Sequence, residues 1–147
     1  MRIVIQRVKE ASVSVNSECI AEINEGLLVL VGFTEGDTEE NINYMVKKIT
    51  ELRIFNDRNG FMNLSVTDIK GSILSVSQFT LYADTKKGRR PSFDKSLNKD
   101  EALKLYEIFN NKLRETNLDI KTGCFGEKME VNLINDGPVT IIIDSRE

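Results

Sequence analysis

The sequence predicts an α+β fold in which a mainly antiparallel β-sheet, or partial barrel, carries two amphipathic helices. Three observations predict it. Strand-like runs follow one another in the first and last thirds of the chain instead of alternating strictly with helices. Two segments repeat apolar residues at helical spacing. The length of 147 residues, 40 % of them hydrophobic, predicts one domain spanning 1–147.

The strands are predicted from apolar periodicity and from the turn residues between the runs. Residues 27–31 are apolar on both faces, which indicates a central, fully buried strand. Near the end, Gly137-Pro138 interrupts a strand-like stretch, and local turn chemistry alone favours a hairpin turn there. Strands are expected at 2–9, 12–15, 19–23, 27–33, 53–55, 73–79, 119–125, 129–135 and 139–144.

Two helices are predicted, at 37–52 and 99–116. Asp37 is expected to cap the first, because its side chain can accept a hydrogen bond and Glu40 follows three residues later. So many strands in a short chain leave sheet edges that must be covered or paired, and a homodimer is the natural expectation. The apolar helix faces comprise Ile42, Met45, Val46, Ile49 and Leu52 in the first, and Ala102, Tyr106, Phe109 and Leu113 in the second.

The composition excludes several kinds of chemistry. Without histidine no Ser-His-Asp or Cys-His machinery can form, and two distant cysteines cannot complete a usual zinc site. No Walker-type or dinucleotide-type glycine loop is present, so neither a metal nor a cofactor is expected. The first ten residues carry charges every few positions, unlike a signal peptide, and no apolar run approaches membrane-spanning length. A cytoplasmic protein with no membrane partner is expected.

A polar block ends the predicted strand 73–79. Ser77, Gln78 and Thr80 surround Phe79, and strand ends are common places for sites. The hydroxyls and the amide can donate and accept hydrogen bonds, and the backbone N–H of Phe79 is a candidate donor to a developing oxyanion. The alternative is a polar strand end whose hydroxyls cap their own backbone.

A basic run follows in the predicted loop 84–98, in a chain whose net charge is −3. An acidic chain argues against general coating of nucleic acid, but a local patch could still grip phosphates near residue 77. The alternative is a solvated loop. The cations of this run are Lys86, Lys87, Arg89 and Arg90.

Four motifs, in the same order and spread over essentially the whole chain, resemble those of D-aminoacyl-tRNA deacylases: 5–8 (IQRV), 77–81 (SQFTL), 87–93 (KGRRPSF) and 135–140 (NDGPVT). The resemblance implies a homodimeric hydrolase. Its substrate would be tRNA charged with a D-amino acid or glycine, and the bond cleaved would be the ester to the 3′-terminal ribose. The activity would keep D-residues out of translation.

The resemblance also implies roles for individual residues. Gly137 and Pro138 would form a cis pair that reaches into the partner's pocket, where its carbonyls exclude L-amino acids and capture the amino group of the D-enantiomer. Arg7 would brace that loop. The pocket for the terminal adenosine and the ester would be lined by Ser77, Gln78, Phe79 and Thr80.

Two further residues, Met129 and Phe125, match the family's adenine side of the pocket. For Met129 a core position is the alternative, because it shares a strand face with Val131 and Leu133. Hydrolysis assisted by the 2′-OH of the terminal ribose is favoured over a Thr80 nucleophile, which lacks an evident base. A tRNA-binding module without catalysis is a further alternative.

Overall fold

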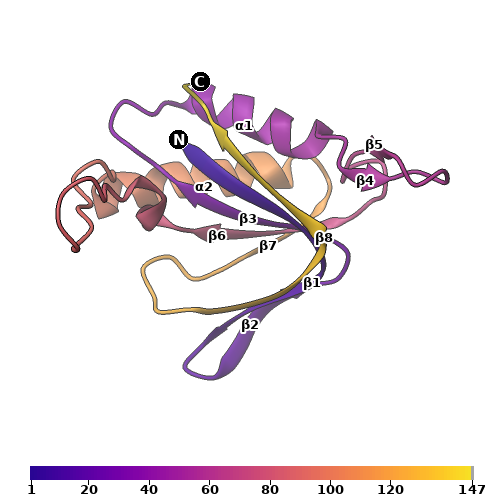
Figure 1. Cartoon of the computed structure of the whole chain (residues 1–147), viewed down its shortest axis with the longest axis horizontal. Helices are drawn as coiled ribbons and strands as arrows, with labels where there is room; N and C mark the ends of the chain where they lie inside the picture. Colours follow the sequence, from indigo (N-terminus) through magenta and orange to yellow (C-terminus); the bar gives the residue numbers. More distant parts are fainter. Residues whose placement is uncertain (147) are drawn as a thin grey trace.

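A strongly curved six-stranded sheet packs against two helices in the computed structural model, which describes residues 1–146 (Figure 1). The helices lie on one face of the sheet, and a small two-stranded hairpin projects to one side. The sheet contains β1 (Arg2–Val15), β2 (Glu18–Ile23), β3 (Gly26–Gly32), β6 (Ser72–Ser77), β7 (Asp119–Thr122) and β8 (Glu130–Asp144). The remaining elements are α1 (Glu39–Glu51), α2 (Lys99–Arg114), the hairpin β4 (Phe55–Asn56) and β5 (Met62–Leu64), and the 3-10 helix η1 (Phe79–Tyr82).

The predicted α+β class with two helices is confirmed, but the sheet is mixed and forms a nearly closed barrel. Strand β1 pairs antiparallel with β2, β3 and β8, whereas β3 pairs parallel with β6 and β6 parallel with β7. Parallel neighbours need a crossover connection, and α1 and α2 lie in the two segments that supply it. The predicted runs of consecutive strands did not indicate these two crossover connections.

Several predicted boundaries are wrong for local reasons. Strands 2–9 and 12–15 form one continuous strand, β1. The strand predicted at 73–79 ends at Ser77 because the chain turns into η1 at Phe79, and the one predicted at 119–125 ends at Thr122. The segment predicted at 53–55 contributes only Phe55 to β4, whose partner β5 follows the turn at 57–61.

The hairpin interpretation of Gly137-Pro138 is wrong. Strand β8 continues through the dipeptide, and both of its halves pair with β1: Thr140 lies opposite Gln6 and Asn135 opposite Val8. Residues 136–139 therefore form a large bulge beside Arg7, in which the Gly137–Pro138 bond is cis. A bulge lets one strand carry extra residues without ending its pairing, so the proline interrupts the hydrogen bonds only locally.

The predicted central strand is confirmed, because β3 lies between β1 and β6 and is buried on both faces. Its residues alternate between two apolar clusters. Leu27, Val29 and Val31 face the helices, together with Ile42, Met45, Ile49, Phe109 and Leu113. On the opposite face, inside the curve of the sheet, Leu28 packs with Val8, Val13, Leu74 and Val76. Within residues 1–146 no helix is long and apolar enough to cross a membrane.

The start of α1 departs from the prediction, because Thr38 is the N-cap and not Asp37. The backbone N–H of Thr38 donates to Asn41 Oδ1 at 2.8 Å, which forms the capping interaction that had been expected from Asp37 and Glu40. The apolar face of the helix is as predicted, with Ile42, Met45 and Ile49 fully buried.

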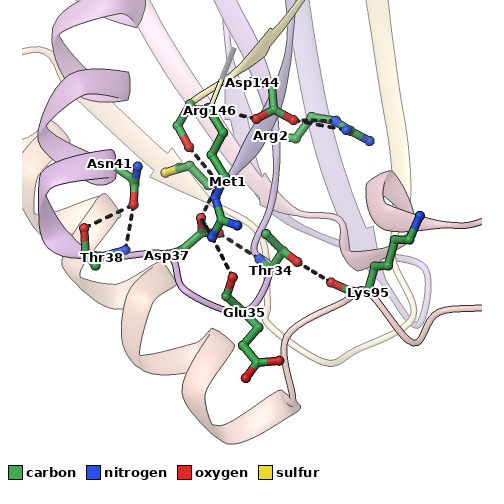
Figure 2. A network of polar contacts seen from close by, with 11 residues as sticks. Met1, Arg2, Thr34, Glu35, Asp37, Thr38, Asn41, Lys95, Asp144 and Arg146 are labelled. Atoms are coloured by element: carbon green, nitrogen blue, oxygen red, sulfur yellow. Dashed lines mark hydrogen bonds and ion pairs between the residues drawn. The ribbon is translucent and has the colours of Figure 1, made fainter.

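Asp37 instead holds three chain segments together (Figure 2). Its buried carboxylate accepts hydrogen bonds from the Met1 amino nitrogen at 2.5 Å, from Thr34 N at 2.7 Å and from Arg146 Nη2 at 3.1 Å. A neighbouring pair, Arg2 and Asp144, joins the beginning of β1 to the end of β8. Burial of the Met1 amino group lowers its pKa, and the contact with Asp37 opposes that change.

Replacing Asp37 with Ala is expected to lower the free energy of unfolding by about 3–5 kcal/mol, because the Met1 amino group then loses its carboxylate partner and keeps only the hydrogen bond to Ser145 Oγ. Urea denaturation followed by circular dichroism measures the loss. Glu35→Ala is the matched control, since that side chain is exposed and only its backbone carbonyl is used by Arg146. A loss for Asp37→Ala as small as that of the control would contradict the assignment.

Candidate active site

A cavity of about 580 Å³ opens at the carboxyl ends of the parallel strands β3 and β6. Its walls come from five segments that are distant in sequence. These are the end of β3 (31–33), the end of β6 with the start of η1 (76–79), the loop 93–97, the first turn of α2 at Lys99 and Ala102, and the segment 125–131 up to the start of β8.

The turn from β6 into η1 is fixed by the backbone. Gln78 N donates to Val31 O at 2.7 Å, which ties the turn to the end of β3. Phe79 then begins η1, and its N–H makes no backbone hydrogen bond within residues 1–146, as is usual for the first residue of a helix. The Phe79 carbonyl accepts from Ser96 Oγ at 2.9 Å. Among the described residues the Phe79 N–H therefore has no hydrogen-bond partner, and Phe79 itself lines the cavity.

Thr80 lies just outside the cavity, in contrast to Ser77, Gln78 and Phe79, which line it. The Thr80 side chain is exposed, and its hydroxyl accepts a short hydrogen bond of 2.5 Å from Gln78 Nε2. Within residues 1–146 no carboxylate or amine is hydrogen bonded to that hydroxyl. The bond orients the Gln78 amide and provides no base for Thr80.

Aromatic and sulfur-containing side chains form much of the remaining wall. Phe79, 56 % exposed, meets Phe93 edge to face at a centroid separation of 5.1 Å. Phe125 packs against the ring of Tyr106 at 5.8 Å. Met129 lies directly against Gly123, where an added Cβ would be 2.7 Å from its sulfur. Met129 thus lines the cavity and also packs against the apolar cluster behind it, as its alternative core position predicted.

Few ionisable groups border the cavity. In the part of its lining that the structure describes, the charged side chains are Lys99 and Glu127. Behind the wall, burial raises the pKa of Tyr106, so its phenol remains protonated and donates to Ser75 O at 2.8 Å. Because the chain also lacks histidine, the site has no imidazole base and offers positioning and hydrogen-bond donors.

The Gly137-Pro138 bulge lies away from this cavity in the same chain, since neither residue is in its lining. Two side chains hold it. Arg7, only 6 % exposed, donates through Nε to Asp136 O at 2.7 Å and through Nη1 to Ile54 O at 2.7 Å. Asn135 accepts from Val139 N at 2.8 Å and closes the bulge. Gly137 and Pro138 themselves are exposed, and the contacts of Arg7 and Asn135 hold the residues on either side of them.

The predicted phosphate-binding cations lie on an exposed loop whose ends are joined by the bridge between Asp84 and Ser92. A hydrogen bond from Lys86 N, with the ammonium of Lys95 nearby, lowers the pKa of Asp84. The four cations are outside the cavity lining, although Phe93 at the end of the loop is within it. They are Lys86, Lys87, Arg89 and Arg90.

The structure therefore brings together five of the predicted site residues, Ser77, Gln78, Phe79, Phe125 and Met129, and leaves the others elsewhere. Sequence reasoning missed Gly32, Ser96 and Lys99 as parts of the same wall. Gly32 had a detectable signal, because a glycine ends a strand that is otherwise bulky and apolar. The other two come from a loop and a helix start that carry no pattern pointing to residue 77.

Comparison with known proteins agrees with the motif resemblance. A sequence profile of the family described as D-Tyr-tRNA(Tyr) deacylase matches residues 4–144. A D-aminoacyl-tRNA deacylase of Bacillus pumilus is 57 % identical over 147 residues, covering 100 % of both chains. One from Bacillus licheniformis is 56 % identical over 146 residues, covering 99 % of both chains.

Solved structures give the same fold. A c-Myc DNA unwinding element binding protein superimposes with a TM-score of 0.92 at 42 % identity, covering 98 % of both chains. A probable eukaryotic D-amino acid tRNA deacylase superimposes with a TM-score of 0.84 at 19 % identity, covering 97 % of both chains, a likeness that concerns the fold alone.

Fold, site and matches together define a hydrolase of the aminoacyl-tRNA deacylase class. The chain belongs to the D-Tyr-tRNA(Tyr) deacylase family.

Gly32→Ala is expected to lower kcat/KM for D-aminoacyl-tRNA about 10- to 100-fold, because its Cβ would lie 2.9 Å from Gln78 O and displace the turn that leads to Phe79. Steady-state deacylation kinetics measure the change, with circular dichroism to verify folding. Glu40→Ala is the control, because Glu40 is exposed on α1 and lies outside the cavity lining. Unchanged kinetics in a folded Gly32→Ala protein would show that the turn does not limit the reaction.

Proposed function

We propose that this protein hydrolyses the ester between a D-amino acid, or glycine, and the 3′-terminal adenosine of tRNA, and that it rejects L-aminoacyl-tRNA. D-aminoacyl-tRNA deacylation follows from family membership. The observation that carries the rest is the cavity at the end of β6, where the free amide of Phe79 and the side chains of Ser77 and Gln78 border an apolar recess. The Phe79 N–H is the proposed oxyanion donor.

The proposed chiral filter is the Gly137-Pro138 bulge of a second copy of the chain. Its backbone carbonyls would face the cavity of the partner, leave no room for an L side chain and accept hydrogen bonds from the substrate's amino group. Two features support this role: the bulge is exposed, and Arg7 and Asn135 hold it from behind. Because the bulge does not reach the cavity of its own chain, the proposal requires a homodimer.

The proposed chemistry is attack by water with the help of the substrate's own 2′-OH. An aminoacyl ester is already activated, so orientation and an oxyanion donor supply much of the barrier lowering, the donor contributing about 3–4 kcal/mol. The alternative Thr80 nucleophile is less well supported, because its hydroxyl is outside the cavity and is engaged by Gln78 instead of a base. The basic loop 86–90 would contact phosphates farther along the tRNA.

The central test compares wild type and Gly137→Ala on D-Tyr-tRNA and L-Tyr-tRNA. Wild type is expected to cleave only the D-ester at an appreciable rate. The added Cβ would lie 2.6 Å from Val139 N, at a residue whose φ is +154°, so the bulge must shift. We expect the ratio of L to D rates to rise about tenfold or more.

Glu130→Ala, an exposed change on the same strand, is the matched control and should leave the ratio unchanged. Equal wild-type rates on the two esters would refute the chiral filter. Binding of tRNA without hydrolysis of either ester would favour the non-catalytic alternative.

Thr80→Ala is expected to retain most of the wild-type kcat, whereas D-Tyr-tRNA ending in 2′-deoxyadenosine should react about 100-fold or more slowly with the wild-type enzyme. Single-turnover assays with both substrates measure this. Loss of activity in Thr80→Ala with tRNA binding preserved, together with normal turnover of the deoxy substrate, would reverse the choice in favour of the nucleophile.

A further inference from the structure

Lys99 is the one cation in the described lining of the cavity, and we propose that it binds the phosphate on the 5′ side of the terminal adenosine of the substrate. The inference rests on the proposed function, in which the terminal nucleoside and its ester occupy this cavity. It assigns a phosphate subsite to a residue that is distinct from the basic loop at 86–90.

The backbone around Lys99 fixes where its ammonium lies. Lys99 is the first residue of α2, whose N-cap Asn98 accepts from Glu101 N at 3.0 Å. From there the side chain crosses the turn at Gly126, where an added Cβ would be 3.1 Å from Lys99 Cε and 3.2 Å from Nζ. Gly126 has a φ of +81°, so this turn favours glycine and leaves room for the ammonium.

The ammonium has no counter-ion of its own. Within residues 1–146, Lys99 Nζ forms no ion pair and no hydrogen bond, although the exposed Lys95 and the half-buried Lys112 both pair with carboxylates. Glu127 is the carboxylate in the cavity lining, and it lies beyond the 4.0 Å of an ion pair with Lys99. Glu101, two residues along the helix, is engaged by Asn98 Nδ2. An incoming phosphate would therefore not have to displace a protein carboxylate.

The size of the cavity explains why a phosphate should reach this point. A volume of about 580 Å³ is in the range of sites that hold one drug-sized ligand, and a nucleoside ester is a ligand of that size. The rest of the tRNA is too large for this cavity and must leave it through the rim. The first charged group on that path is the phosphate on the 5′ side of the terminal adenosine. Lys99 is exposed at that rim, and lysine binds phosphate as a point charge that needs no bidentate geometry.

The test uses three D-tyrosyl esters with the wild-type protein and Lys99→Ala: D-Tyr-tRNA, the ester of adenosine 5′-monophosphate and the ester of adenosine, which has no phosphate. We expect Lys99→Ala to raise KM about tenfold for the two phosphate-bearing esters, with kcat unchanged, and to leave both constants unchanged for the adenosine ester. The dependence of log KM on log salt for D-Tyr-tRNA should become shallower by about 0.7.

Lys128→Ala is the matched control, because this exposed lysine lies in the same turn but outside the lining. Lys99→Arg should restore KM for the phosphate-bearing esters. An equal rise in KM for all three esters would overturn the proposal in favour of a structural role, and no rise for any of them would overturn it outright.

A binding measurement separates this proposal from the proposed function. By calorimetry, wild type should bind adenosine 5′-monophosphate about tenfold more tightly than adenosine, and Lys99→Ala should bind both equally. If wild type hydrolysed none of the esters, the proposed function would fail, and calorimetry would still decide the role of Lys99. Equal affinities of wild type for adenosine and adenosine 5′-monophosphate would overturn the phosphate subsite even in an active enzyme.

Discussion

The burial of β3 on both of its faces is the constraint on which the rest of the structure depends. A strand with apolar side chains on both sides needs a layer above and a layer below. The helices supply one layer, and the curved ends of β1, β2 and β8 supply the other. The sheet must curl to provide both, and its curl places the carboxyl ends of β3 and β6 at the wall of a cavity instead of an open edge.

The elements with strong local signals were predictable from the sequence, and those set by long-range pairing were not. The apolar run of β3 and the apolar faces of α1 and α2 behaved as their periodicity indicated. The parallel pairing of β3 with β6 was missed because nothing in either strand encodes its direction. The local residues around Gly137-Pro138 favour a hairpin turn. The bulge is decided by the pairing of both halves of β8 with β1, which the local sequence does not show.

The site was predictable to the extent that its residues are adjacent in sequence. Ser77, Gln78 and Phe79 form one turn, so their motif identified a wall of the cavity directly. Lys99 and Ser96 reach the same cavity only because α2 packs against β7 and contacts β6 through Tyr106, which composition cannot indicate. The roles of Asp37 and Thr38 show the same limit, because the buried amino group that recruits Asp37 is distant in sequence.

A cavity without a histidine base suits a substrate whose bond is already activated better than one whose bond is inert. Cleavage of an amide needs a strong nucleophile and protonation of the leaving amine, which this chain, lacking histidine, has few means to supply. When an aminoacyl ester is cleaved, the leaving group is a ribose oxygen, and the neighbouring ribose hydroxyl can share its proton. Correct placement of the ester is then the main requirement on the protein. Gln78 and Phe79 are held by one backbone hydrogen bond to Val31 and by one hydrogen bond from Ser96, and orientation of a substrate requires rigidity of this kind. A site of this kind discriminates by the shape and placement of the ester more than by the strength of its chemistry, and that is the property a proofreading hydrolase needs.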